Sequence, residues 1–233
     1  MKYCNIVPAT FLSRPNRFVA KVIFNGREES VHVKNTGRCQ EILVPGCRVY
    51  LADSQNEKRK LRYDLVAVEK SSPDRPNLLI NMDSQAPNAV VEEWLRGGGH
   101  NLFSPGALIK REVTFGSSRF DFFVMDQIRT LYLEVKGVTL EREGLALFPD
   151  APTQRGVKHI EELICAKEMG HDAAILFVIQ MQEIHAFSPN DQTHPAFGAA
   201  LRKAAEHGVQ ILAMDCRVTK DSLSISSPVP VLL

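Results

Sequence analysis

Charged residues interrupt an otherwise apolar β-strand pattern in the middle of this sequence. Asp121 lies in one apolar run, and Glu134 and Lys136 lie two residues apart in the next. Two carboxylates supply the oxygen ligands that a hard divalent cation such as Mg²⁺ or Mn²⁺ prefers. A neighbouring ammonium can orient or deprotonate the attacking water and offset developing negative charge. These residue types favour metal-dependent hydrolysis of a phosphodiester.

A salt-bridged surface strand is the alternative interpretation. Lys136 would then neutralise Glu134, and Asp121 would cap a turn. An acid followed some way on by Glu-x-Lys is common by chance, so the spacing alone leaves both interpretations open. Burial would favour chemistry, because a buried charge is costly unless a partner or a metal offsets it.

An antiparallel hairpin would bring the three side chains together. The runs Phe120–Met125 and Leu131–Val135 are aromatic, branched or long apolar, and a short turn-like segment separates them. If the turn is centred between residues 127 and 128, Asp121 lies directly across from Glu134. Side chains two apart in a strand share a face, so the lysine of Glu-x-Lys joins both acids there.

A further strand and its turn would add groups to this site. The run Leu108–Phe115 predicts a third antiparallel strand. Glu112 within it is placed to become a third carboxylate, or else to pair with a neighbouring basic residue. Ser118 and Arg119, at the turn into the hairpin, are placed to contact a phosphate or to hold the first acid.

A helix is predicted after the hairpin. Apolar residues at helical spacing continue to Gly170, and Thr153 is a plausible N-cap. The first turns present Arg155, Lys158 and His159. A helix N-terminus favours anions and basic side chains strengthen a phosphate site, although exposed helix surface is the alternative for each residue taken singly.

The first part of the chain reads as a small all-β module. Asn25-Gly26, within Arg17–Val33, separates strand-like runs and predicts a hairpin. Two short strand candidates follow, Arg48–Ala52 and Tyr63–Val68. Short strands separated by loops fit a five-stranded barrel of the oligonucleotide-binding (OB) type, with a barrel that binds no ligand as the alternative.

Two loops of this module are candidates for nucleic-acid contact. Lys58 and Arg59 begin a basic run that can track a phosphate backbone or simply be solvated. Asn35 and Thr36 follow a strand, and we interpret them as turn chemistry first and a polar ligand loop second.

A polar, proline-containing connector divides the sequence. We place an OB-like domain at 1–72 and a nuclease-like domain at 77–233. The second domain reads as helix, three antiparallel strands, helix, strand, helix, strand. The predicted fold class is therefore α+β/α/β, with a small OB-like β-barrel followed by a mixed sheet flanked by helices.

Composition and charge limit the classes of protein to which this chain can belong. A formal net charge of +1 gives no global electrostatic case for nucleic acid or membrane. No run approaches the roughly 20 apolar residues of a membrane span, so we expect a cytoplasmic protein without a membrane partner. The five cysteines are scattered, which makes a zinc site or a disulfide framework unexpected.

Five sequence blocks match the pattern of a known family nearly end to end. They are Asn35-Thr36-Gly37, Arg119-x-Asp121-Phe122, Glu134-Val135-Lys136-x-Val138-Thr139-Leu140, Phe148-Pro149-Asp150-Ala151 and Thr153-x-Arg155-Gly156-x-Lys158-His159. The chain resembles the sugar fermentation stimulation protein A family, and its second domain is similar to the PD-(D/E)xK restriction-endonuclease-like superfamily. One departure is that Phe120, and not the proline of that superfamily, precedes the first acid.

The resemblance implies binding to nucleic acid, expected to be DNA, and a link to regulation of sugar use. As an enzyme, the protein would be a Mg²⁺- or Mn²⁺-dependent nuclease with Asp121 and Glu134 as metal ligands and the Val135 carbonyl as a third. Lys136 would orient the water, and Glu112 would hold a water or a second ion. A shared fold does not establish turnover.

Two other functions stay open from the sequence. In a non-catalytic DNA-binding regulator of sugar metabolism genes, the barrel and the basic helix start would hold the backbone and the acids would be idle. The other open function is that of a sugar- or nucleotide-binding protein, for which the sequence shows no cleft signature. The acids favour the enzyme, because a pure DNA binder would gain affinity by losing negative charge near phosphates. A homodimer is compatible with the sequence.

Overall fold

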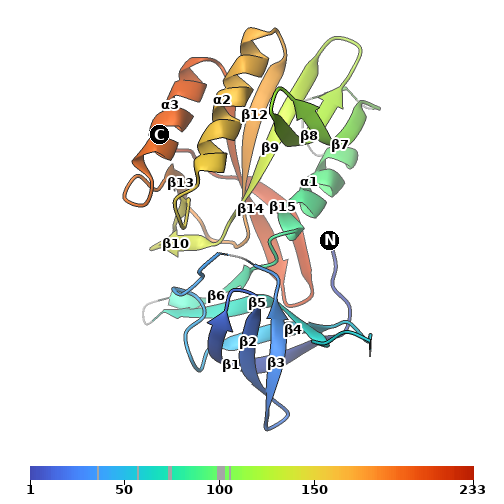
Figure 1. Ribbon diagram of the computed structural model, residues 1–233, viewed down its shortest axis with the longest axis vertical. Helices are drawn as coiled ribbons and strands as arrows, with labels where there is room; N and C mark the ends of the chain where they lie inside the picture. Colours follow the sequence, from blue (N-terminus) through green and yellow to red (C-terminus); the bar gives the residue numbers. More distant parts are fainter. Residues whose placement is uncertain (36, 57, 73–74, 99–102, 105) are drawn as a thin grey trace.

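The computed structural model describes the chain except for residues 36, 57, 73–74, 99–102 and 105. A β-barrel forms one end of the molecule, and a sheet with helices on both faces forms the other (Figure 1). Within the described parts of the chain, no helix combines the length and the apolar character needed to cross a membrane.

Five strands form the barrel: β1 (Ile6–Asn16), β2 (Val19–Phe24), β3 (Arg27–Val33), β4 (Arg48–Asp53) and β5 (Tyr63–Ser72). Their order is β3-β2-β1-β4-β5, and a β3–β5 pairing closes the ring. The turn between β2 and β3 places Asn25 and Gly26 at φ values of 50° and 75°, which a type I′ hairpin requires. The predicted OB-like barrel and its first hairpin are confirmed.

Strand β1 was not predicted, and its two prolines explain why. Pro8 pairs with Tyr50 of β4, whereas pairing with β2 begins only at Thr10. At Pro8 the strand is therefore an edge on the β2 side, where a missing N–H costs no ladder hydrogen bond.

The connector between the domains contains more structure than predicted. Strand β6 (Arg75–Asn81) pairs with β5 and carries the first sheet to residue 81. Asn81 then donates its N–H to the carbonyl of Gln180 in the second domain, at 2.9 Å. The boundary between residues 72 and 77 stays a prediction.

The second domain is built on a mixed sheet of order β15-β14-β12-β9-β8-β7. Its strands are β7 (Leu108–Phe115), β8 (Ser118–Met125), β9 (Thr130–Val138), β12 (Asp172–Ile179), β14 (Gln210–Thr219) and β15 (Ser222–Pro228). The pairs β9–β12 and β12–β14 are parallel, and the others are antiparallel. The predicted mixed sheet flanked by helices is confirmed.

Three helices cover this sheet: α1 (Ala86–Arg96), α2 (Gln154–Glu168) and α3 (Pro195–Glu206). Helix α1 packs on one face, and α2 and α3 pack on the other (Figure 1). A small sheet of β10 (Leu140–Arg142), β11 (Leu145–Phe148) and β13 (Ala186–Pro189) was not predicted, and neither was β15. The strands of the small sheet have only three or four residues each, too short for a readable alternation.

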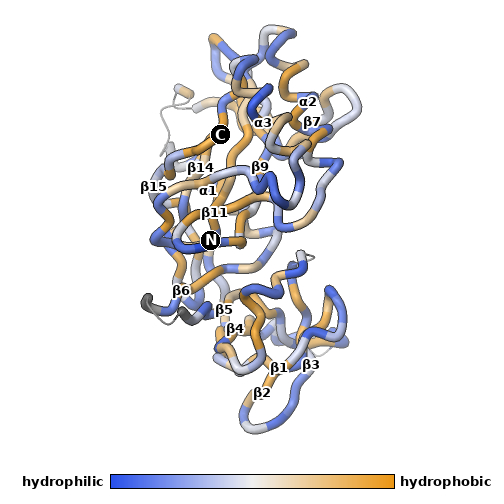
Figure 2. Tube along the Cα trace, turned by 90° about the vertical axis from the view of Figure 1, so that its left-hand side faces the viewer, coloured by the Kyte–Doolittle hydropathy of each residue, from blue (hydrophilic) through white to orange (hydrophobic). Residues whose placement is uncertain are grey.

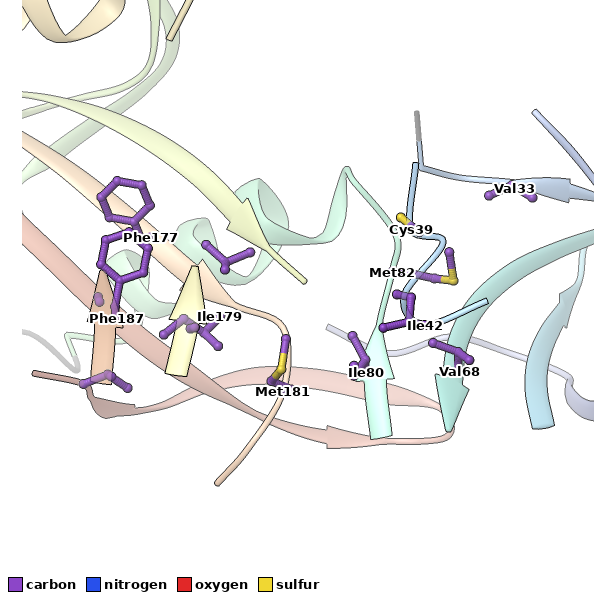
Figure 3. Close-up of a cluster of buried hydrophobic side chains, with 14 of the residues drawn as sticks. Val33, Cys39, Ile42, Val68, Ile80, Met82, Phe177, Ile179, Met181 and Phe187 are labelled. Atoms are coloured by element: carbon purple, nitrogen blue, oxygen red, sulfur yellow. The ribbon is translucent and has the colours of Figure 1, made fainter. Parts of the chain in front are cut away.

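The core is continuous between the two domains. Hydrophobic segments follow the strands in the interior of both, and hydrophilic segments form outer loops such as the β2–β3 turn (Figure 2). Figure 3 shows one buried cluster that runs from Val33 and Ile42 of the barrel through Met82 and Met181 to Phe177 of the second sheet. The barrel is therefore packed against the second domain.

Candidate functional site

Strands β8 and β9 form the predicted hairpin. Their pairing runs from Met125↔Thr130 to Phe122↔Leu133. This register is the one that the predicted turn requires, and its last pair, Phe122↔Leu133, lies one residue before Asp121 and Glu134.

Strand β8 changes face at Asp121. Phe120 packs on the α2 side, with its ring centroid 6.2 Å from that of His159, whereas Phe122 belongs to the buried cluster under α1. Residues two apart in a regular strand point to the same side, so the strand twists at the residue between them. The Asp121 carboxylate accepts the Val135 N–H at 2.8 Å just beyond the last paired rung.

The Asp121 carboxylate sits in surroundings that disfavour its charge. Burial raises its pKa above the ordinary value, and the negative charge of Glu134 raises it further. The Val135 N–H and the Asn88 amide, which donates from 2.7 Å, act in the opposite direction without cancelling the rise. Without a cation, the Asp121 carboxyl therefore holds its proton more readily than an aspartate in water does. Sequence reasoning missed Asn88 as a partner.

Glu134 is almost fully buried, with 2% of its surface exposed. Its Oε1 accepts hydrogen bonds from Lys136 Nζ and from His159 Nδ1, the latter at 2.5 Å. Burial would raise the pKa of Glu134, but the His159 hydrogen bond and the Lys136 charge outweigh burial and lower it. The other oxygen, Oε2, is buried without a hydrogen-bond partner in the described structure.

A hard cation fits these groups. The free Glu134 Oε2 and the Asp121 carboxylate are oxygen donors of the kind that Mg²⁺ and Mn²⁺ take. Over the described ranges, no three His, Cys, Asp or Glu side chains gather into one metal-holding group. Further ligands would therefore be a main-chain oxygen such as that of Val135, water or substrate.

The predicted third carboxylate does not join this pair. Glu112 lies in β7 at a φ of 54°, its side chain is 58% exposed, and it pairs with Arg119 at 3.4 Å. This left-handed backbone conformation interrupts the regular strand alternation that the prediction assumed. Ser118 lies nearby with its hydroxyl buried and unpartnered in the described structure.

Helix α2 brings its first turns to the site. Thr153 is the N-cap as predicted, because its hydroxyl accepts the Gly156 N–H at 3.0 Å. His159, expected on a phosphate-facing surface, is instead buried against Glu134 with 4% exposed. Arg155 donates its Nε–H to His159 Nε2 at 3.3 Å, and Lys158 is exposed.

The barrel residues predicted to contact nucleic acid differ in how far they are already engaged within the protein. Arg59 makes a two-pronged ion pair with Asp64, at 3.0 and 2.7 Å, whereas Lys58 is exposed. Asn35 Oδ1 accepts the Gly37 N–H at 2.7 Å, which is the turn chemistry expected there. Thr36 lies outside the described residues.

Two hollows lie between the domains. One of about 910 Å³ is lined by residues that include Lys70 and Glu141. The other, of about 350 Å³, is lined in part by Asn35, Gly137 and Thr153. Sequence reasoning missed both hollows, because their walls come from segments that meet only in the folded chain.

A closed OB barrel followed by a helix-flanked mixed sheet defines the class, a two-domain protein with an OB-type first domain and a mixed α/β second domain. Family models match both parts: "SfsA N-terminal OB domain" over residues 12–77 and "Sugar fermentation stimulation protein RE domain" over residues 85–222. The chain belongs to the sugar fermentation stimulation protein family, which confirms the resemblance stated from its sequence blocks.

Relatives match along the whole chain. A sugar fermentation stimulation protein homolog of Desulfitobacterium hafniense (strain DSM 10664 / DCB-2) is 54% identical over 233 residues, covering 100% of this chain and 99% of that protein. The homolog of Clostridium beijerinckii is 51% identical over 100% of both chains. The solved structure of Pyrococcus furiosus SfsA in complex with Ca²⁺ is similar with a TM-score of 0.88 and 28% identity, covering 100% of this chain and 98% of that one.

Proposed function

We propose that this protein is a Mg²⁺- or Mn²⁺-dependent phosphodiesterase that cleaves nucleic acid, expected to be DNA. One observation carries the proposal: Glu134 Oε2 is buried and unpartnered in the described structure, and Asp121, across the hairpin, has a raised pKa. A buried acceptor without a partner costs about 1–3 kcal/mol. A cation held between these groups would offset that cost and favour the ionised Asp121. The Ca²⁺ complex of Pyrococcus furiosus SfsA supports a divalent cation.

Each residue of the site has a separate role in this proposal. Asp121 and Glu134 hold the cation, with the Val135 carbonyl as a third ligand. The bound cation would lower the pKa of water and neutralise phosphate charge. Lys136, with 18% of its side chain exposed, keeps further N–H donors beyond its bond to Glu134. These donors orient the attacking water and offset the charge that develops on the phosphate.

His159 and Arg155 orient Glu134 in this proposal. Because Arg155 donates to His159 Nε2, the ring accepts there and donates from Nδ1 to Glu134 Oε1. Lys136 contacts the same oxygen. Glu134 Oε2 is thereby left for the cation, in the way that outer partners commonly fix metal-binding carboxylates.

Nucleic acid would approach over the exposed basic groups near α2. Arg119 and Lys158 are exposed beside the β7–β8 turn, where Lys158 donates to the Ser117 carbonyl at 3.2 Å. We assign backbone contacts to these two residues and to Ser118, with Lys58 of the barrel as a more distant contact. Such contacts act mainly through counterion release.

Two measurements test the proposal. Purified protein is incubated with single- and double-stranded DNA in Mg²⁺, in Mn²⁺ and in excess chelator, with cleavage followed on gels. Calorimetry then compares cation binding in wild type and Asp121→Asn. The proposal predicts metal-dependent cleavage and loss of cation binding in the variant. Equal cation affinity in the two proteins would remove the metal site, and tight DNA binding without cleavage would favour a regulator.

A further inference from the structure

The smaller interdomain hollow has no assigned role and lies beside the proposed reaction centre. Its volume of about 350 Å³ is within the range of ligand pockets. Gly137 in its wall directly follows Lys136, and at about 3.3 Å per strand residue it lies roughly 10 Å beyond Glu134. A substrate strand crossing the site can therefore reach into the hollow with a neighbouring nucleotide.

The chemistry of the walls does not suit a phosphate. Asp150 is the one charged side chain among the described lining residues, which include no lysine or arginine. Leu147, Phe148 and Pro149 contribute apolar surface. A phosphate would meet a carboxylate without a compensating cation, whereas a planar ring with N–H donors would find both apolar walls and acceptors.

One acceptor in the wall belongs to a buried side chain and accepts no side-chain hydrogen bond within the described structure. Gln180 is 1% exposed, and its Nε2 donates to Asn81 Oδ1 at 2.9 Å and to the Asp83 carbonyl at 3.1 Å. These two bonds fix the amide, and its Oε1 accepts no hydrogen bond within the described structure. The oxygen lies toward Gly137, where a Cβ would come within 2.6 Å of it. A fixed acceptor of this kind can take an N–H donor from a ligand.

The barrel side of the hollow is held in place. The Arg14 guanidinium donates to the carbonyls of Gly37, Arg38, Arg17 and Asn35 at 2.6–2.8 Å. A Cβ at Gly37 would lie 2.6 Å from Asp150 Oδ2, so the barrel loop approaches that carboxylate closely. The barrel loop and the Gln180 amide are therefore positioned before any ligand arrives, which lowers the cost of binding.

We propose that this hollow takes one unstacked nucleobase of the substrate strand, next to the phosphate that is cleaved. The inference rests on the proposed function and adds the substrate class. Asp150 and Gln180 accept N–H groups from the base edge, so cytosine, adenine and guanine, which carry amino groups, bind better than thymine. Single-stranded or mismatched positions are preferred, because their bases unstack at the lowest cost.

The test measures binding without requiring cleavage. Wild type in Ca²⁺ is titrated with five-nucleotide strands of equal charge: oligo(dC), oligo(dT) and a strand in which every nucleotide is abasic. We expect the abasic strand to bind about tenfold more weakly than oligo(dC), with oligo(dT) between them. Asp150→Ala, at an exposed position, should lower oligo(dC) affinity to that of oligo(dT). Glu143→Gln, which also removes an exposed negative charge but lines only the larger hollow, should keep the preference.

The other outcomes overturn the inference. Equal affinity for the three strands in wild type, or the same result in Asp150→Ala and Glu143→Gln, would show that no base enters the hollow. Binding of free dCMP as tight as that of oligo(dC) would assign the hollow to a mononucleotide and not to a strand. A base preference that disappears in Asp150→Ala, in a protein that never cleaves in Mg²⁺ or Mn²⁺, would leave the base-binding role of the hollow standing and overturn only the catalytic proposal.

Discussion

Replacing His159 by leucine tests how Glu134 is held. Leucine fills a similar volume but cannot donate to Glu134 Oε1, from which His159 Nδ1 lies 2.5 Å away. A hydrogen bond to a charged group contributes about 1.5–3 kcal/mol, and loss of an outer partner typically lowers metal affinity about 10- to 100-fold. We therefore expect a fall of about that size in Mn²⁺ affinity by calorimetry, with a folded protein confirmed by its urea transition.

His159→Asn is the matched control, because an asparagine amide nitrogen can take the place of Nδ1. This variant should recover most of the Mn²⁺ affinity, while His159→Leu should not. A merely structural histidine would give similar affinities in both variants, with losses that follow their stability. Wild-type affinity in folded His159→Leu would refute the assigned role.

Three further outcomes follow from the charges. Because the folded pKa of Asp121 is raised, the metal-free protein should lose stability as the pH rises from the ordinary aspartate pKa to the raised one, and urea titrations of Asp121→Asn should lack that loss. Mn²⁺ binding should weaken as the pH falls through the same window, since protons compete with the cation, whereas a flat calorimetric profile would contradict the raised pKa. Lys58→Glu should weaken DNA binding more at low salt than at high salt. Arg59→Glu should instead mainly destabilise the barrel, because it breaks the pair with Asp64. DNA affinities measured by anisotropy that respond equally to salt in the two variants would contradict this distinction.

Local signals were enough for much of the fold and for the hairpin. Asn25-Gly26 carries its own turn geometry, and the strand expected after the second helix is β12. The register of β8 and β9, which brings the Asp121 carboxylate to the Val135 N–H, followed from turn position and strand alternation alone. In each case the structure is determined by neighbours in sequence.

Features set by tertiary packing were not predictable in the same way. Glu112 leaves the predicted group because of a left-handed backbone conformation that its sequence does not signal. The inward position of His159 had a signal, since it precedes Leu163 by four residues on the buried stripe of α2, but its basic character favoured a surface role. The smaller interdomain hollow could not be predicted, because its walls form only when both domains are folded and packed together.

The most direct test of the central claim is Lys136→Ala, with cleavage and DNA affinity measured on the same protein. A lysine that serves the attacking water acts in the transition state, so affinity should stay nearly unchanged while the cleavage rate falls. Proton-transfer catalysis alone is typically worth about 10² to 10⁴ in rate, and we expect a loss in that range. Unaltered cleavage by a well-folded Lys136→Ala protein, or an affinity loss that shrinks as salt rises while cleavage per bound complex is unchanged, would contradict the catalytic role.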